Sequence, residues 1–167
     1  MKILVTGGAG YIGSHTCVLL LEAGHDVTVI DNLCNSSAIA LERVQELAGR
    51  SLRFVQGDVR NRADLNRAFE GGIEAVIHFA ALKAVGESCE QPLAYFDNNI
   101  GGTITLMQAM EAHRVDRLVF SSSATVYGEP DAVPIREDAP LRVTNPYGRT
   151  KLVVEQLIED WCKARPK

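Results

Sequence analysis

The sequence contains few of the features that mark metal-binding, disulfide-rich or membrane proteins. Its four cysteines form no Cys-x-x-Cys pair and no Cys/His cluster with zinc spacing, so we expect reduced thiols and no metal site. No apolar run approaches the roughly 18 residues that are needed to span a bilayer. The first residues carry the charge of a signal peptide but lack its apolar region and cleavage site, which favours a cytoplasmic location.

Charge of one sign is not in large excess either. The 167 residues are 46% hydrophobic and 23% charged, with a formal net charge of −4, which is typical of a globular protein of about one domain. This mild acidity gives no reason to expect a nucleic acid or a membrane as a partner. The four histidines are scattered, and we expect His15 and His78 to be packed or hydrogen-bonded rather than ligands.

Short apolar runs alternate with helix-like stretches along the whole chain. We expect strands at residues 3–5, 27–30, 53–55, 75–79 and 117–120, and helices at about 11–23, 38–48, 64–69, 92–113 and 147–164. In the last helix, Val153, Leu157 and Trp161 recur every four residues and are expected to face the core. Strands that alternate with helices predict an α/β fold, a doubly wound parallel sheet of the Rossmann type.

A Rossmann sheet usually has a sixth strand after such a helix, but in this sequence only residues 165–167 follow the final helix. We therefore expect residues 1–167 to form an incomplete Rossmann domain, truncated after the helix that follows the fifth strand. In that case the fifth strand is an unpaired apolar edge, which favours self-association or aggregation.

A glycine-rich turn links the first expected strand to the first expected helix. Gly7, Gly10 and Gly13 give the spacing G-x-x-G-x-x-G. This spacing allows a tight turn, close approach of the backbone to a pyrophosphate, and close packing of helix against strand. The N–H groups at the helix N-terminus would then face the phosphates, so the turn predicts a dinucleotide site.

Two aspartates at strand ends fit the remainder of such a nucleotide. Asp31 ends the second strand, where an acidic residue binds the hydroxyls of the adenosine ribose. Residues 32–37 contain no Arg or Lys that would accommodate a 2′-phosphate, which favours NAD over NADP. Asp58 follows the third strand and is placed to meet the adenine amino group, although an aspartate in an ordinary turn explains it equally well.

Tyr147 and Lys151 are four residues apart, and Ser123 lies 24 positions before the tyrosine. On a helix, residues i and i+4 share a face, so the ammonium can lie beside the phenol. A phenol with a pKa of about 10 becomes a base near neutral pH only with stabilisation of its anion by about 4 kcal/mol. A lysine and a cationic cofactor ring could supply this. An isolated pair of this kind is more often solvated on a surface, and the other motifs favour the catalytic interpretation.

Four longer stretches carry a closer resemblance: GYIGSHT at 10–16, DNLCNS at 31–36, HFAALKAVGES at 78–88 and SSSATVYG at 121–128. With these, the chain resembles the extended short-chain dehydrogenase/reductase family, and within it the enzymes that epimerise nucleotide sugars. The resemblance covers the whole chain. It implies NAD as the cofactor, UDP-glucose and UDP-galactose as the substrates, and a homodimer for full-length relatives.

The reaction that this resemblance implies is reversible oxidation at C4 of the UDP-bound hexose. Tyr147 would remove the proton of the 4-hydroxyl as NAD takes the hydride, which then returns to the other face of the keto sugar. Ser123 would hydrogen-bond the same hydroxyl, and Lys151 would bridge the nicotinamide ribose and lower the pKa of Tyr147. The resemblance also places Ser123 and Tyr147 in contact with the cofactor. It assigns further cofactor contacts to Tyr11, Ile12, Asn32, Leu33, Cys34, Asn35, Ser36, Val59, Phe79, Ala80, Lys83 and Asn98.

Other functions in the same family, or none, are the alternatives. Dehydratases and decarboxylating relatives carry acidic residues beside the serine, where this chain has Ala124 and Thr125, which favours epimerisation. Family members are about twice as long, and their second half binds the UDP-sugar. A non-catalytic NAD-binding fragment therefore remains the rival, and we expect weak NAD binding and little or no turnover. Acceptance of N-acetylated UDP-hexoses stays open.

Overall fold

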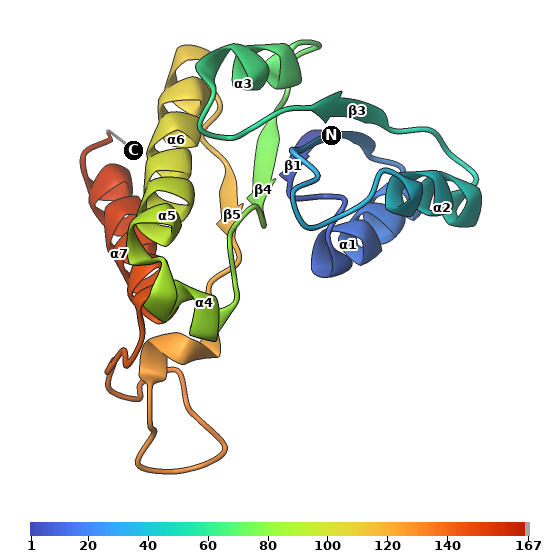
Figure 1. Ribbon diagram of the computed structural model, residues 1–167. Helices are drawn as coiled ribbons and strands as arrows, with labels where there is room; N and C mark the ends of the chain where they lie inside the picture. The colour runs from blue at the N-terminus through green and yellow to red at the C-terminus, as the bar shows by residue number, and fades with distance from the viewer. Residues whose placement is uncertain (166–167) are drawn as a thin grey trace. The chain divides into compact units, whose positions relative to one another are not determined.

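Five parallel strands form one sheet in the order β3-β2-β1-β4-β5 (Figure 1). The strands are β1 (Lys2–Thr6), β2 (Asp26–Asp31), β3 (Arg53–Gln56), β4 (Ala75–His78) and β5 (Leu118–Phe120). The order runs outward from β1 in both directions, so the sheet has a topological switch point between β1 and β4. The prediction of a doubly wound parallel sheet of the Rossmann type is confirmed.

The computed structural model describes residues 1–165, which form two compact units. The first unit, residues 1–80 and 102–121, contains the whole sheet. Its helices are α1 (Tyr11–Glu22), α2 (Ile39–Ala48), α3 (Arg62–Phe69) and α6 (Gly102–Ala112). In this unit α1 contacts α2, and α3 contacts α6 (Figure 1).

The core of the first unit follows from the alternation of side chains along the strands. Val5 and Val29 pair in register and are fully buried with residues of α1 and α2, among them Leu21. Leu4 and Ile30 point to the opposite face of the sheet and are equally buried. The central strands β1, β2 and β4 read as nearly continuous apolar runs because both faces of the sheet are covered there.

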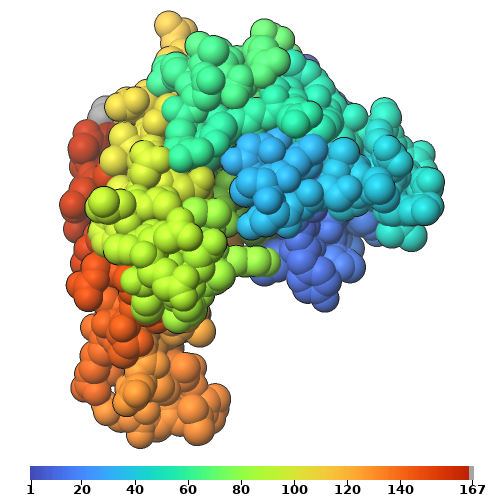
Figure 2. Space-filling view, viewed as in Figure 1, coloured from blue at the N-terminus to red at the C-terminus, as the bar shows by residue number. Residues whose placement is uncertain are grey.

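The second unit, residues 81–101 and 122–165 of the described chain, is built around the last helix. It contains α4 (Val85–Glu90), α5 (Pro92–Tyr95), the π-helical segment η1 (Phe96–Gly101), the 3₁₀ turn η2 (Ala124–Tyr127) and α7 (Pro146–Lys163). The segments α4, α5, η1 and η2 all contact α7. Residues 128–145 form a mostly exposed loop, orange in Figures 1 and 2.

The helix expected over 92–113 is helical from residue 92 to residue 112, but two details were missed. It consists of three consecutive segments, α5, the π-helical η1 and α6, of which α6 belongs to the first unit. The short helix α4 was not expected, since its six residues carry no clear apolar period. A π-helical turn is a local widening that hydrophobic periodicity does not report.

The core-facing stripe expected on the last helix was also wrong. Its most buried residues include Tyr147, Thr150, Lys151 and Val154, whereas Val153, Leu157 and Trp161 are half-buried. The buried face of this helix carries polar side chains, and the predicted apolar stripe lies on the neighbouring face, one residue earlier in sequence. Trp161 instead stacks with the guanidinium of Arg165, 3.5 Å from the ring centroid.

Within residues 1–165, β5 pairs only with β4 and so forms one edge of the sheet. Its middle residue, Val119, is 62% exposed. This agrees with the expected apolar edge, while self-association through it stays a prediction. No helix in this described part of the chain has both the length and the apolar character to cross a membrane.

Candidate functional site

The glycine turn of the first unit is packed so closely that side chains would not fit. Gly7 has φ +70°, and a Cβ built there would lie 2.7 Å from the backbone N of Ala80. A Cβ on Gly13 would lie 2.3 Å from the carbonyl oxygen of Gly7. Gly10 caps α1 without a side-chain hydrogen bond, so the first N–H groups of this helix keep their capacity for an anion. The turn therefore fits a pyrophosphate. Beside it, Tyr11 and Ile12 are exposed, at 75% and 56%.

Asp31 lies at the end of β2 and holds this turn and the next loop together. One carboxylate oxygen accepts the N–H of Ala9 at 3.0 Å, and the other accepts the N–H of Leu33 and the hydroxyl of Ser36, each at 2.9 Å. The side chain is buried, with 8% exposure. The aspartate predicted to bind a ribose thus also orders the loop beside the turn, where Leu33 takes a left-handed φ of 58°.

The structure brings Asp58 beside the same loop. Asn32 donates to the carboxylate of Asp58 at 3.1 Å and accepts the N–H of Cys34 at 3.1 Å. Arg60 donates to both carboxylate oxygens of Asp58 from its side chain, and these hydrogen bonds lower the pKa of Asp58 to about 2. Sequence reasoning missed Arg60, although its place two residues after an aspartate is a visible signal.

Several other predicted cofactor residues also lie in the first unit. Val59 is buried, whereas Cys34 and Asn35 are exposed. Phe79 and Ala80 follow β4, where their N–H groups bond to the backbone oxygen and the hydroxyl of Thr6. The Thr6 hydroxyl also lies 2.6 Å from Nδ1 of buried His78, so this histidine is packed and hydrogen-bonded, as expected.

In the second unit, buried Asn99 joins two segments that carry predicted cofactor residues to α7, the helix of the predicted catalytic residues. Its amide nitrogen donates to the carbonyl of Leu82 at 2.9 Å and to the hydroxyl of Thr150 on α7 at 3.0 Å. Its amide oxygen accepts the N–H of Leu82 at 2.8 Å. Lys83 follows Leu82 and is exposed, and Asn98 donates to Asn99 at 3.0 Å. Asn99 therefore fixes the loop before α4, the π-helical turn and α7 to one another.

Tyr147 and Lys151 lie on one face of α7, as i, i+4 spacing requires. They are 9% and 5% exposed, and the lysine Nζ lies 6.0 Å from the centroid of the tyrosine ring. Burial lowers the pKa of Lys151 to about 8. The start of α7 is held by the Asn145 side chain, which accepts the N–H of Gly148, and by buried Ser88, whose hydroxyl accepts the N–H of Tyr147 at 3.2 Å.

Ser123 lies at the start of η2 in the same unit. Its hydroxyl oxygen accepts the N–H of Thr125 at 3.2 Å and the hydroxyl of Thr125 at 2.9 Å. The neighbouring Ser122 donates to the carboxylate of Glu155 on α7, a partner that the sequence did not suggest. Among the described residues the Tyr147 hydroxyl makes no hydrogen bond, so Ser123 and Tyr147 are not joined directly.

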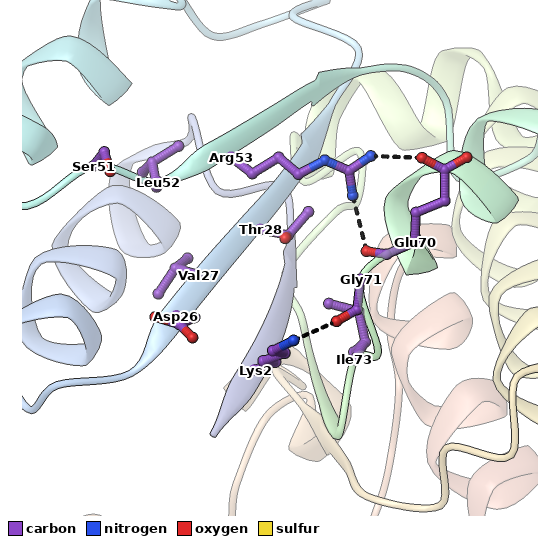
Figure 3. Close-up of a pocket in the computed structure, with 10 residues that line it drawn as sticks. All are labelled: Lys2, Asp26, Val27, Thr28, Ser51, Leu52, Arg53, Glu70, Gly71 and Ile73. Atoms are coloured by element: carbon purple, nitrogen blue, oxygen red, sulfur yellow. Dashed lines mark hydrogen bonds and ion pairs between the residues drawn. The ribbon is translucent and has the colours of Figure 1, made fainter.

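A cavity of about 330 Å³ lies at the other end of the strands in the first unit (Figure 3). The charged groups on its wall are paired with neighbouring protein groups. Arg53 donates to the carbonyl and the carboxylate of Glu70, and Lys2 donates to the carbonyl of Gly71. None of the predicted site residues lines this cavity. In residues 1–165 no three His, Cys, Asp or Glu side chains gather as metal ligands.

Known proteins match this chain along almost its whole length. It is 56% identical to the UDP-glucose 4-epimerase of Dictyostelium discoideum over 99% of this chain and 48% of that protein. It is 59% identical to the UDP-glucose 4-epimerase of Bacillus subtilis (strain 168) over 96% of this chain and 48% of that protein. The chain thus spans about half the length of these curated relatives.

Solved structures show the same similarity. The UDP-glucose 4-epimerase from Bifidobacterium longum, in complex with NAD⁺ and UDP, matches with a TM-score of 0.97 at 49% identity, over 99% of this chain and 50% of that one. A family model described as the NAD dependent epimerase/dehydratase family matches residues 3–166. With the Rossmann-type sheet and its glycine turn, these matches show that the chain belongs to the NAD dependent epimerase/dehydratase family.

Proposed function

We propose that this chain supplies the cofactor-binding and proton-transfer residues of an enzyme that interconverts UDP-glucose and UDP-galactose at the sugar C4. The observation that carries this proposal is the burial of Tyr147 beside Lys151 on α7, at 9% and 5% exposure. A pair of these residues on a solvated surface would be exposed. The names of the relatives, UDP-glucose 4-epimerases from several organisms, support the same reaction.

The cofactor is proposed to be NAD, and the first unit fits its adenosine and pyrophosphate. The close backbone packing at Gly7 and Gly13 leaves no room for side chains, and the N-terminus of α1 offers N–H groups to phosphates. The carboxylate of Asp31 has remaining lone pairs for a ribose hydroxyl. The chemistry that NAD supplies when bound is the acceptance and return of a hydride. The solved Bifidobacterium longum relative, a complex with NAD⁺ and UDP, supports both the cofactor and the substrate class.

In the second unit, Tyr147 is proposed as the base that removes the proton of the sugar 4-hydroxyl during oxidation. The same phenol returns the proton when the keto sugar is reduced again, so the proton balance closes within one turnover. Lys151 is mostly charged at pH 7, because its pKa is about 8, and a cation near the phenol favours the phenolate. Ser123 is proposed to donate a hydrogen bond to the sugar oxygen whose proton moves.

About half of each relative lies outside the region that this chain matches. We therefore propose that residues 1–167 are the NAD-binding part, that the UDP-sugar pocket is built mainly elsewhere in such proteins, and that this chain alone turns over slowly or not at all. A non-catalytic NAD-binding module is the second candidate, favoured by the same half-length match. Both candidates predict that the chain binds NAD, and only the enzyme candidate predicts turnover.

The test measures both properties on the purified chain. Calorimetric titration of the parent chain should show NAD binding and weaker or no NADP binding. The variant Tyr147→Phe should bind NAD as the parent does. Conversion of UDP-galactose should be slow, and any conversion should disappear in Tyr147→Phe. If NAD binds and no conversion is detected, the module candidate is favoured. A folded chain that does not bind NAD at millimolar concentration contradicts the proposal, and turnover at ordinary enzymatic rates contradicts the proposed slow turnover.

A further inference from the structure

The hydroxyl of Ser123 is held by two donors from the same residue. Ser123 has extended backbone angles, φ −151° and ψ 145°, and caps the 3₁₀ turn η2. Its oxygen accepts the backbone N–H of Thr125 at 3.2 Å, an ordinary capping bond. It also accepts the side-chain hydroxyl of Thr125 at 2.9 Å, which a cap does not require. The second bond therefore has no evident role in forming the turn.

The two accepted bonds constrain where the serine proton can go. A serine hydroxyl has one proton and two lone pairs. With both lone pairs facing Thr125, the proton of Ser123 is left for donation to a group other than Thr125. Without the threonine hydroxyl, one lone pair is open, and the serine hydroxyl can rotate among three staggered positions.

Thr125 is itself fixed by packing against the start of α7. A Cβ built on Gly148 would lie 2.9 Å from the carbonyl oxygen of Thr125 and 3.1 Å from its hydroxyl. Gly148 thus lets the threonine contact the helix turn that carries Tyr147. A β-branched side chain has few rotamers, so contact on this side leaves its hydroxyl aimed at Ser123.

We propose that Thr125 is a positioning residue, whose hydroxyl orients Ser123 so that the serine proton is presented to the reacting sugar oxygen. This rests on the proposed function, in which Ser123 donates to that oxygen. In the sequence, Thr125 is informative only because it stands where related enzymes carry a carboxylate. The structure gives its hydroxyl a positive role in the same step.

The direct test of this orientation does not need turnover. Three variants are compared with the parent chain: Thr125→Val, which keeps the shape and removes the hydroxyl, Thr125→Ser, which restores a hydroxyl, and Thr16→Val. The last removes another threonine hydroxyl, one that donates to a backbone carbonyl at 3.0 Å in α1. Three-bond couplings of isotope-labelled serine report the χ1 rotamer of Ser123 by NMR. We expect one rotamer in the parent, averaging in Thr125→Val, and one rotamer again in Thr125→Ser and Thr16→Val.

The second readout is the turnover of UDP-galactose in the same variants. If the three rotamers become equally populated, the productive one falls to a third, so kcat should fall about threefold in Thr125→Val. NAD affinity and KM should be unchanged, and Thr125→Ser should recover most of the rate. A single Ser123 rotamer in folded Thr125→Val overturns the proposal, and so does unchanged kcat in a parent chain that is active. An inactive parent contradicts catalysis by this chain alone, while the rotamer measurement still decides the role of Thr125.

Discussion

Replacing Lys151 should make the protein more stable while removing a proposed catalytic group. The side chain is 5% exposed, and its burial lowers the pKa from 10.5 to about 8. The difference of about 2.5 pKa units corresponds to roughly 3 kcal/mol, at about 1.36 kcal/mol per unit. Because the folded state binds this proton less tightly than the unfolded state, the destabilisation of the folded state by Lys151 is fully present below pH 8. It is relieved as the pH rises from about 8 to 10.5. Lys151→Met keeps an unbranched side chain and removes the charge.

Urea unfolding followed by far-ultraviolet circular dichroism measures this effect. At pH 7 the free energy of unfolding of Lys151→Met should exceed that of the parent by up to about 3 kcal/mol, and the gap should close towards pH 10.5. Lys163→Met is the matched control. Lys163 is exposed on the same helix and pairs with Glu159 at 2.7 Å, which raises its pKa, so its removal should not stabilise. Equal or lower stability of Lys151→Met at pH 7, with no change in pH dependence, would show that burial of the charged Lys151 does not destabilise the fold.

Two further predictions concern the first unit. Gly13→Ala should lower the free energy of unfolding by at least about 2 kcal/mol, because its Cβ would lie 2.3 Å from the Gly7 oxygen. Gly10→Ala is its control in the same urea titration, since the nearest atom would be 3.3 Å away, and equal losses for both would contradict the packing argument. Burial raises the pKa of Cys17 to about 12, so a disulfide reagent at pH 8 should label three thiols in the native chain and the fourth only in urea. Rapid labelling of all four thiols in the native chain would show that Cys17 is accessible.

The parts of the fold that sequence could predict are those set by neighbouring residues. The glycines at 7, 10 and 13 lie in one βα turn, and Tyr147 and Lys151 are one helical turn apart. The sequence spacing of these residues therefore determines their relative positions. The central strands β1, β2 and β4 were found because strands covered on both faces are nearly continuous apolar runs. These features need no knowledge of distant parts of the chain.

The supporting contacts could not be predicted, because each joins residues far apart in sequence. Ser88 accepts the N–H of Tyr147 across 59 positions, and Asn99 donates to Thr150 across 51. A serine in a short helix or an asparagine beside another asparagine gives no signal of such a role. The wrong stripe on the last helix has the same cause, since the polar residues Thr150 and Lys151 are buried by partners that the local pattern does not contain.

The burial of Lys151 also limits how it can assist the proposed base. The lysine helps a phenolate only while it is charged, and burial reduces the pH range over which it is charged. With a pKa of about 8, it is mostly charged at pH 7 and mostly neutral by pH 9. The same environment that brings the ammonium next to Tyr147 therefore weakens it as a cation. Proton transfer by this pair would require a balance between closeness and hydration, and the burial of Lys151 on α7 leaves the lysine charged near neutral pH.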